Sequence, residues 1–306
     1  MIKKTIYFGN PTRLSVELNQ LRIAIPGHDR GDLETVTSRP IEDIGMVIID
    51  HPQIVITSSV LQSLADAGAA VVCCDRRHMP AGLMMHLENN SLQSERFRTQ
   101  LDCSLPLKKQ LWQQTVAAKI LNQAKALESL TGERHDNMFV WSGKVKSGDS
   151  DNLEGRAAAY YWKTLFGKFP GSSRNRDGDE PNSMLNYGYA VLRAIVARAL
   201  VSSGMHPSLG LFHKNKYNAY CLADDIMEPY RPYVDLMVFA LCGQFGSPSI
   251  SDRSVRQHLL TLATTDVEIE GKRHPLMVGV SLTTASLFKC YAGEIRKIRY
   301  PEIRIS

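Results

Sequence analysis

The spacing of the apolar residues changes near Pro80, and this change constrains the fold more than any other feature of the chain. Before Pro80, apolar residues alternate with polar ones or form short runs between turn residues, as in Leu14–Leu18 and Leu21–Ile25, and this pattern is typical of β-strands. After Pro80, apolar residues recur every three or four positions, which is the spacing of amphipathic helices. The sequence therefore predicts an α+β fold, with a small β-rich N-terminal domain over 1–80 and a larger α-helical domain over 81–306.

The same spacing predicts the individual elements. A helix is expected to start at Ser58 or Ser59, where a serine can cap it, and a loop is expected over 168–181. Strands are expected at Ile6–Phe8, Leu14–Leu18, Leu21–Ile25, Gly45–Ile49, Ile54–Ile56 and Ala69–Cys74. Helices are expected over Leu83–Glu88, Ser94–Leu101, Leu107–Leu130, Leu153–Phe166, Ser183–Ser203, Ala219–Met227, Val234–Cys242 and Ser281–Ile295. No glycine-rich phosphate loop follows any expected strand, which argues against a nucleotide-binding domain.

Composition narrows the class of protein. The six cysteines form no CxxC pair, so the sequence suggests neither a zinc ribbon nor a dithiol redox motif, and we expect reduced thiols. The opening residues, Met1–Thr5, lack the apolar stretch of a signal peptide, and no uninterrupted apolar run reaches the roughly 18 residues of a membrane span. We therefore expect a cytoplasmic protein that has no membrane partner.

The charge of the chain favours anionic partners. The formal net charge is +5, although many enzymes of other classes are equally basic. The basic residues are not gathered in a tail, and they include Arg76 and Arg77 at the end of the β-rich part. This distribution suits a surface that lies along a phosphate backbone, while an ordinary solvated face remains the simpler explanation of any single cluster.

Three segments of the helical half carry polar groups that could bind a metal. The first contains Glu154, which shares a helix face with Ala158, Tyr161 and Leu165. A carboxylate on an apolar face needs a partner, because burying an unpaired charge is costly. The alternative is a capping box in which Asp151 is the N-cap and Glu154 closes the first turn, and this segment alone favours the cap.

The second segment, Gly210–Asn218, is a polar connection between two expected helices and contains His213. A neutral imidazole at this position can bind a metal, and the adjacent Lys214 can face a phosphate. The alternative is a loop histidine without a functional role, which is the commoner case for an isolated histidine.

The third segment places Asp224, Asp225 and Glu228 within about one helical turn. Three like charges at a helix C-terminus repel one another and the helix dipole, and a bound cation would relieve this repulsion. The alternative is that Arg231 and nearby lysines neutralise the acids at the surface.

Two carboxylates and one histidine on separate helical segments suit Mg²⁺ or Mn²⁺, and the imidazole slightly favours Mn²⁺. Such an ion catalyses phosphodiester chemistry.

With these segments in view, the chain resembles the CRISPR-associated integrase family, whose members perform spacer acquisition with a small partner protein. The resemblance spans nearly the whole chain and keeps the order and rough spacing of the elements. The opening and the overall length are most similar to the versions from type II systems, which carry the large RNA-guided nuclease. The matching segments are Tyr7–Pro11, Pro40–Ile44, Cys74–Asp75 with His78 and Pro80, Glu154–Ala158 before Tyr161–Trp162, Leu185–Tyr189, Gly210–His213 and Leu222–Pro229.

The resemblance implies a site in the helical domain that holds Mg²⁺ or Mn²⁺. Carried over by motif, its ligands are Glu154, His213 and Glu228, with Asp224 or Asp225 as competitors for the third position. Core packing is the simpler explanation of Tyr189. The residues that we expect to contact DNA or to support the ligands are Tyr161, Asn186, Tyr189, Lys214, Tyr217, Arg231, Arg76 and Arg77.

The resemblance also implies the activity and the partners. The activity is that of a metal-dependent DNA endonuclease and integrase of antiviral defence, which joins captured DNA to the repeat array by transesterification. Nicking of branched DNA is the same chemistry with water as the nucleophile. The implied partners are double-stranded DNA of the captured fragment and the CRISPR repeat, a second copy of this chain, a small ferredoxin-like protein and other type II CRISPR proteins. We expect the homodimer and the partner contacts in the N-terminal domain.

Two other functions fit the same residues. A DNA-binding scaffold without activity would need only the basic surface and the helical half, with its acids in salt bridges, and it would bind no metal. A metal-dependent nuclease outside CRISPR, or a transposon integrase built on the same plan, would keep the metal site and differ in its DNA substrate.

Overall fold

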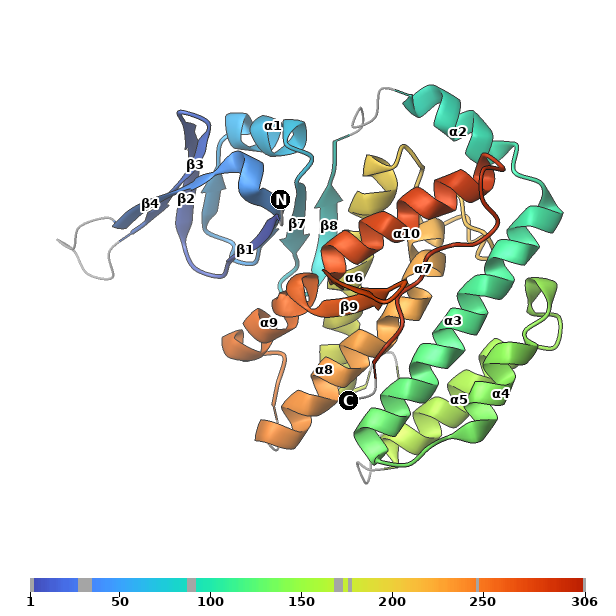
Figure 1. The fold of residues 1–306 in the computed structure, drawn as a ribbon. Coiled ribbons are helices and arrows are strands. Elements are labelled where there is room, and N and C mark those ends of the chain that lie inside the picture. The colour runs from blue at the N-terminus through green and yellow to red at the C-terminus, as the bar shows by residue number, and fades with distance from the viewer. Residues whose placement is uncertain are drawn as a thin grey trace. The chain divides into compact units, whose positions relative to one another are not determined.

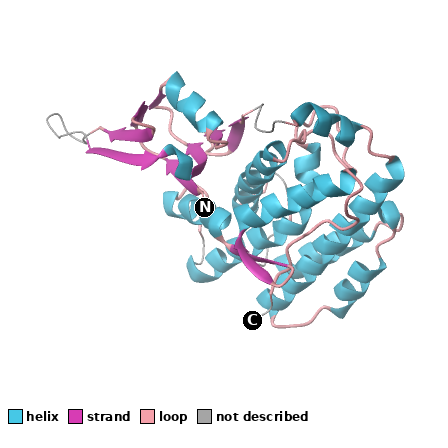
Figure 2. Cartoon of the chain, turned by 45° about the horizontal axis from the view of Figure 1, so that its top comes forward, coloured by secondary structure: helices cyan, strands magenta, loops and turns pink. Residues whose placement is uncertain are grey.

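The computed structural model describes residues 3–26, 35–86, 92–167, 173–175, 178–245 and 248–304. The chain divides into an N-terminal unit, Met1–Ser91, and a C-terminal unit, Leu92–Ser306. This division comes after the one expected at residue 80, because the segment that follows Pro80 forms a strand of the first unit. Strands dominate the first unit and helices the second (Figure 2), so the predicted α+β fold is confirmed.

The described part of the N-terminal unit forms two four-stranded sheets. The first has the order β1-β5-β7-β8, in which β1, β5 and β7 are parallel and β8 is antiparallel to β7. The second has the order β4-β3-β2-β6, and its β2–β3 pair is the expected hairpin. The elements are β1 (Lys4–Phe8), β2 (Thr12–Glu17), β3 (Gln20–Ile25), β4 (Thr35–Pro40), η1 (Ile41–Asp43), β5 (Ile44–Ile49), β6 (Ile54–Ile56), α1 (Ser58–Asp66), β7 (Ala70–Cys74) and β8 (Pro80–Met84).

Two expectations for this unit were wrong. Leu83 and Met84 do not begin a helix but end β8, where they pair with β7, and residues 87–88 of the expected helix lie outside the described residues. The edge of β7 offers backbone partners that a short apolar run can use, and Pro80 and Gly82 are poor helix formers. The N-cap of α1 is Thr57 instead of Ser58 or Ser59, and its side chain makes no capping hydrogen bond.

The C-terminal unit contains every other expected helix and several elements that the spacing did not predict. The unpredicted elements are α4, α9, the β9–β10 hairpin and the short 3₁₀ helices η2, η3 and η4. Of the expected loop over 168–181, residues 168–172 and 176–177 lie outside the described residues. The elements are α2 (Gln93–Leu101), α3 (Leu105–Thr131), α4 (Asp136–Lys144), η2 (Ser147–Asp149), α5 (Leu153–Phe166), α6 (Asn182–Ser202), α7 (Cys221–Met227), η3 (Glu228–Tyr230), α8 (Arg231–Phe245), α9 (Arg253–Leu260), η4 (Thr261–Thr264), β9 (Asp266–Ile269), β10 (Lys272–Pro275) and α10 (Leu276–Tyr291).

The helix α3 organises the unit around the candidate site. It begins after Ser104, whose hydroxyl accepts a hydrogen bond from the Leu107 N–H, and it ends at Gly132 in the left-handed conformation. The helices α4, α5 and α8 and the short helix η3 pack against it, and α3 runs beside α4 and α5 in Figure 1. Segments far apart in the sequence therefore meet along one helix.

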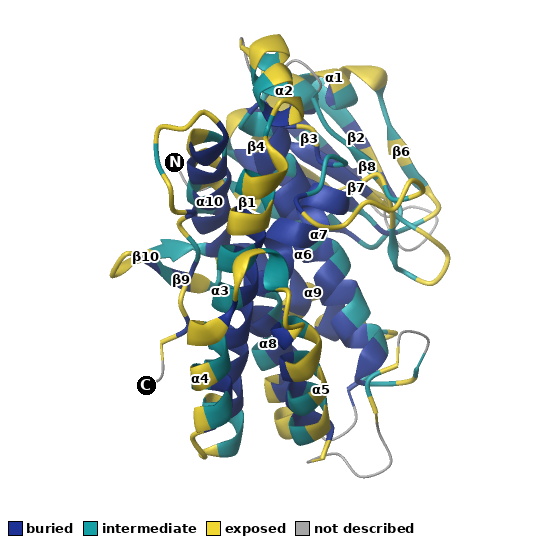
Figure 3. Cartoon of the chain, turned by 90° about the vertical axis from the view of Figure 1, so that its right-hand side faces the viewer, coloured by how far each residue is buried: buried dark blue, intermediate teal, exposed yellow. Residues whose placement is uncertain are grey.

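The core of this unit lies along α6, α7 and α8, where buried residues concentrate, while α4 carries exposed residues (Figure 3). Among the described residues, α6 alone is long and apolar enough to cross a membrane, but 78% of the relevant window is buried inside the protein. This burial identifies α6 as a core helix.

Candidate functional site

The first turn of α5 is capped without the carboxylate of Glu154. Asn152 adopts the left-handed conformation, and its side chain accepts a hydrogen bond from the Gly155 N–H at 3.2 Å. The Asp149 carboxylate accepts the Glu154 N–H at 3.0 Å. Asp151 is therefore not the N-cap, and the capping-box interpretation of this segment was wrong. The side chain of Glu154 is free to make another contact.

That contact is with Lys119, near the middle of α3. The Lys119 ammonium lies 2.8 Å from Oε1 of Glu154 and 2.6 Å from Oε2 of Glu228. The second carboxylate oxygen of Glu228 is 3.0 Å from Nη2 of Arg231. The side chains of Lys119, Glu154 and Glu228 are 11%, 21% and 6% exposed. Two glutamates from distant parts of the sequence thus share one buried cation.

The electrostatic balance of this cluster keeps Glu228 and Lys119 charged. Burial raises the pKa of Glu228, but Arg231 and Lys119 outweigh this effect, and the pKa is lowered overall. Burial lowers the pKa of Lys119, but Glu228 and Glu154 outweigh it, and the pKa is raised overall. At neutral pH, Glu228 and Lys119 are therefore an ion pair in a buried setting.

His213 is oriented by Asp225, which is fully buried. Nδ1 of His213 donates to Oδ1 of Asp225 at 2.5 Å, and the carboxylate also accepts the N–H groups of Leu211 at 2.6 Å and Phe212 at 3.0 Å. The hydrogen bond to Asp225 raises the pKa of His213, burial opposes it, and the charges of Glu228 and Glu154 contribute in the raising direction. With Nδ1 bound to a carboxylate, Nε2 is the nitrogen that can bind a metal, as in many metal sites.

The three acids at the end of α7 do not crowd together. Asp224 pairs with Nε of Arg193 at 2.6 Å and accepts from the Asn218 amide at 2.7 Å. Asp225 holds the loop of His213, and Glu228 faces Lys119. The three acids are therefore not held in mutual repulsion, and that expectation was wrong. Of the alternative, the pairing of Glu228 with Arg231 is confirmed, whereas the surface location is wrong, because all three carboxylates are buried. Of the three, Glu228 is the one that lies beside Glu154.

The donor set suits a divalent ion. Two carboxylates that share one cation, together with an imidazole whose pKa their charges raise and whose Nε2 is not used by its carboxylate partner, match the ligand preferences of Mg²⁺ and Mn²⁺. As they stand, no three histidine, cysteine, aspartate or glutamate groups within the described part of the chain converge closely enough to hold an ion. The ammonium of Lys119 lies between the two glutamates instead.

Comparisons with known proteins identify the family. The family model described as CRISPR associated protein Cas1 matches residues 6–246. A protein of Neisseria meningitidis named CRISPR-associated endonuclease Cas1 is 35% identical over 306 residues, which are 99% of this chain and 97% of that protein. The chain belongs to the Cas1 family. The family expected from the sequence motifs is thereby confirmed.

Solved structures with the same fold include two assemblies. A casposase bound to integration product has a TM-score of 0.79 and 20% identity, and the match covers 97% of this chain and 92% of the casposase chain. A chain of a Cas6-RT-Cas1–Cas2 complex has a TM-score of 0.74 and 19% identity, and the match covers 96% of this chain and 35% of that chain. At these identities the likeness shows the Cas1 fold alone.

Of the other expected site residues, Tyr161 and Tyr189 are buried and Asn186 is half-buried. The hydroxyls of Tyr161 and Tyr189 both donate to Asp235, the former at 2.7 Å, and burial raises the pKa of Asp235 to about 6. The Asn186 side-chain oxygen accepts from Arg174 at 3.0 Å. Because both tyrosines are buried, they support the packing behind the site, which agrees with the core interpretation of Tyr189.

The remaining expected residues differ in exposure. Lys214 is exposed, and Tyr217 is 85% exposed with the ammonium of Lys216 over its ring at 4.8 Å. Arg76 and Arg77 are exposed in the N-terminal unit. These side chains are accessible to phosphates, whereas Arg231, described above, is committed to Glu228.

The sequence reasoning missed the polar face of α3. Thr115, Lys119 and Asn122 are buried at spacings of four and three residues, so they share one helix face. Thr115 hydrogen-bonds the Tyr300 hydroxyl at 2.7 Å, and the Asn122 amide donates to the Pro229 carbonyl at 2.8 Å. Polar residues that recur along the apolar face of a long helix were the available signal.

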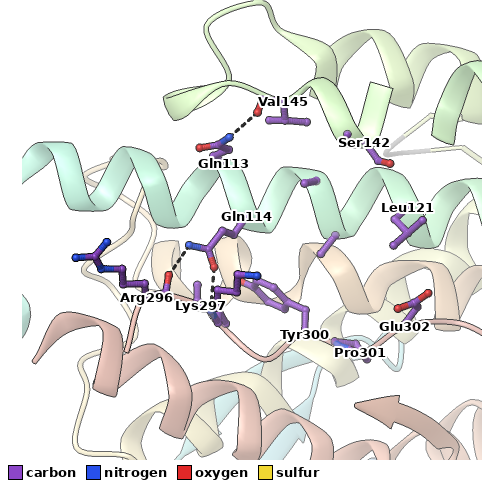
Figure 4. A pocket seen from close by; sticks show the side chains of 14 residues that line it. Gln113, Gln114, Leu121, Ser142, Val145, Arg296, Lys297, Tyr300, Pro301 and Glu302 are labelled. Atoms are coloured by element: carbon purple, nitrogen blue, oxygen red, sulfur yellow. Dashed lines mark hydrogen bonds between the residues drawn. The ribbon is translucent and has the colours of Figure 1, made fainter. Parts of the chain in front are cut away.

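A groove of about 600 Å³ lies elsewhere in the C-terminal unit, between α3, α4 and the segment 296–302. Ala118 and Leu121 line its α3 wall. Figure 4 shows the Gln114 side chain reaching the backbone of the segment, where it binds the Arg296 carbonyl and the Ile298 N–H, each at 2.9 Å. None of the expected site residues lines this groove, so it is separate from the candidate metal site.

Proposed function

We propose that this chain is the integrase of a CRISPR adaptation system, a metal-dependent nuclease and transesterase that inserts captured DNA into the repeat array. Membership of the Cas1 family supports the CRISPR role, and the relative with 35% identity is named an endonuclease. The observation that carries the proposal is the meeting of Glu154 and Glu228 at one buried cation, where the charges of both glutamates also raise the pKa of His213.

In this proposal, Glu154, Glu228 and Nε2 of His213 hold Mg²⁺ or Mn²⁺. When bound, the ion supplies Lewis-acid stabilisation of the charge that develops on a phosphodiester under attack. The protein prepares the ligands for this role. Asp225 fixes the orientation of the imidazole through Nδ1, and Arg231 helps to keep Glu228 ionised.

The proposed reaction joins a 3′-hydroxyl of the captured fragment to a phosphate at the edge of a repeat. The hydroxyl oxygen forms a new bond to phosphorus, the repeat strand leaves as its own 3′-hydroxyl, and the number of phosphodiester bonds is unchanged. Exposed Lys214 and Tyr217, from the same loop as His213, are suited to contact the sugar-phosphate backbone near the site.

The proposed assembly is a homodimer that works in the cytoplasm with a small ferredoxin-like partner of the Cas2 kind. A solved complex that contains Cas1 and Cas2 has a chain of this fold, and a casposase of this fold was solved with DNA. A two-fold dimer presents two sites to the two ends of one fragment. Light scattering of the chain at micromolar concentration is expected to give a dimer, and a monomer would contradict this part of the proposal.

An integration assay tests the function. The reaction contains a repeat-bearing plasmid, the small partner protein, Mn²⁺ and a short duplex with free 3′-hydroxyls. The wild type is expected to join the duplex at repeat edges, and chelation of the metal is expected to stop the reaction. Glu154→Gln is expected to be inactive, while the control Glu302→Gln, at an exposed glutamate paired with Lys125, remains active. Joining that survives chelation would contradict the proposal.

The casposase likeness supports a second candidate, a transposon integrase that uses the same residues. The two candidates differ in their DNA. An integrase of CRISPR adaptation inserts short duplexes of many sequences at one repeat, whereas a transposon integrase requires particular sequences at the ends of the DNA that it inserts. Sequencing of the joined products from a pool of random duplexes distinguishes them.

A further inference from the structure

The position of Lys119 is unusual for a lysine. It lies near the middle of the 27-residue helix α3, and its side chain is 11% exposed. Lysine is almost never buried without a charged partner, because removing an ammonium from water is costly. Here the partners are Glu154 and Glu228, the two carboxylates proposed to bind a metal. The lysine therefore lies where the ligands of a divalent ion would meet.

The contact with Glu228 is close but not well directed. The Lys119 ammonium is 2.6 Å from Oε2 of Glu228, yet within the described residues this buried oxygen receives no properly oriented hydrogen bond. An ion pair of this kind depends on charge more than on direction. A divalent ion, which brings more charge and accepts carboxylate oxygens from several directions, satisfies such an oxygen better than an ammonium does.

The backbone around the site does not depend on Lys119. Asn122, one turn further along α3, donates to the carbonyls of Pro229 and Pro301 at 2.8 and 2.9 Å. Its own side-chain oxygen accepts the Ile303 N–H at 3.0 Å. The hydrogen bond to the Pro229 carbonyl fixes the segment that carries Glu228 to α3, and it does not involve Lys119. The ammonium can leave the two carboxylates while this anchor stays in place.

The charges of the cluster are balanced without a metal. The negative charges of Glu154 and Glu228 face the positive charges of Lys119 and Arg231. A divalent ion added to this arrangement would repel the ammonium, since like charges in a buried site interact strongly. We infer that the Lys119 ammonium is the built-in counter-ion of the metal-free site and that a divalent ion binds by displacing it from between Glu154 and Glu228. This inference rests on the proposed function.

A consequence is that Lys119 lowers the affinity of the site for metal. The ion binds only the fraction of molecules whose ammonium has left the carboxylates, and the apparent affinity falls by that fraction. Removing the ammonium removes this competition. It also leaves two carboxylates without their shared cation, so the metal-free fold becomes less stable and gains more from added metal.

Calorimetric titration with Mn²⁺ alone tests the inference on the whole chain. Lys119→Met keeps the length of the side chain and removes its charge, and it is expected to bind Mn²⁺ at least about tenfold more tightly than the wild type. Its melting temperature is expected to be lower without metal and to rise more on addition of Mn²⁺. The matched control is Lys125→Met, on the same helix at a lysine paired with the exposed Glu302, and it is expected to behave as the wild type.

His213→Ala separates failure of the inference from failure of the proposed function, because His213 makes no contact with Lys119 among those described. If wild-type binding depends on His213 but Lys119→Met binds no more tightly, the counter-ion role is overturned and the metal site stands. If binding does not depend on His213, the proposed site is wrong and the inference is overturned with it. If circular dichroism shows that Lys119→Met does not fold, Lys119→Gln replaces it in the same titration. Glutamine is neutral but can still donate hydrogen bonds.

Discussion

Each unit of the protein contains a cluster of polar side chains around buried carboxylate groups, and the two clusters differ in the partners that the carboxylates have. In the N-terminal unit, Asp50 follows β5 and its side chain is 1% exposed. It accepts hydrogen bonds from the Tyr7 hydroxyl at 2.5 Å and from Nδ1 of His78 at 2.8 Å. In the C-terminal unit, Glu154 and Glu228 instead share the ammonium of Lys119.

The difference separates a structural cluster from a candidate metal site. A single carboxylate that receives directed hydrogen bonds from a tyrosine and a histidine is satisfied by its neighbours. It ties β1 and the end of β5 to the turn between β7 and β8. Two carboxylates around a monovalent cation carry the charge and the oxygen ligands that a divalent ion uses. Burial of an acid is therefore a weak sign of function, and the kind of partner that the acid has is a stronger one.

The largest effect on activity is expected when one carboxylate is removed from each cluster, which tests whether only the cluster of Glu154 and Glu228 is a metal site. Glu228→Gln is expected to lower the rate of strand joining at least about 100-fold. Residues that only support the ligands of a metal contribute up to about 100-fold, and the loss of a ligand itself is expected to cost no less. Asp50→Asn is expected to retain strand joining and to lower the free energy of unfolding by about 1–3 kcal/mol, because a buried donor loses its acceptor. Joining rates and denaturant unfolding of both variants provide the measurement.

Glu228→Gln is also expected to destabilise the metal-free chain, whereas mutual repulsion of the three acids would have made the loss of this charge stabilising. In the structure, Glu228 is paired with Lys119 and Arg231, and its loss leaves the buried Lys119 and the half-buried Arg231 each short of a partner. If Asp50→Asn abolished joining while leaving the fold intact, the distinction between the two clusters would be wrong.

Asp235 sharpens the comparison, because it lies in the C-terminal unit but resembles Asp50 in being held by hydroxyl groups. Burial raises its pKa to about 6 in the folded chain, whereas an exposed aspartate ionises near 3.8. The folded state therefore resists ionisation, and stability falls as the pH rises from about 4 to about 6 and then levels off. The wild type is expected to lose about 3 kcal/mol relative to Asp235→Asn over this range. Urea unfolding of both proteins between pH 4 and pH 8 measures this loss. If the difference in unfolding free energy between the two proteins did not change with pH, Asp235 would not be a buried carboxylate held by the two hydroxyl groups.

Adjacent aspartates at the end of α7 allow a finer comparison. Asp225→Asn replaces the carboxylate that orients His213 by a neutral amide. It is expected to lower strand joining and Mn²⁺ affinity by about 10–100-fold. The matched control is Asp224→Asn, which disturbs the pair with Arg193 and is expected to change Mn²⁺ affinity by less than about threefold. Equal loss in the two variants would show that the loop as a whole, and not the imidazole, is what Asp225 supports.

The smallest expected effect concerns the exposed basic residues. If Lys214 neutralises a DNA phosphate, Lys214→Ala is expected to make the log–log slope of DNA affinity against salt shallower by about one unit. Fluorescence anisotropy of a labelled duplex at several salt concentrations measures the slope. Lys125→Ala is the control, since Lys125 is already paired with Glu302. An unchanged slope in Lys214→Ala would leave this lysine without a role in binding.

Much of the fold could be predicted from the sequence, because local spacing carries it. The hairpin of β2 and β3 and the long helices α3 and α6 follow from apolar periodicity that packing does not override. The strand β8 could not be predicted in this way, because it is a strand only through its pairing with the edge of β7. Apolar spacing within a segment does not show such a pairing. The short helices α4 and α9 lack a long enough repeat to stand out.

The candidate site was predictable in part. Glu154, His213 and Glu228 were found through motifs, and the structure brings the two glutamates together. Lys119 was not found, because the polar spacing that it shares with Thr115 and Asn122 along α3 was not followed, and this spacing alone does not say which partners the lysine meets. Its importance depends on where α5 and η3 pack against α3, and only the folded chain shows that.

Diffraction from crystals grown with Mn²⁺, recorded at a wavelength where manganese scatters anomalously, tests the metal site and the role of Lys119 together. One strong anomalous peak bound by Glu154, Glu228 and Nε2 of His213 is expected, with the Lys119 ammonium withdrawn from both carboxylates. A structure without a peak at this position, in which Lys119 still bridges Glu154 and Glu228, would contradict this expectation.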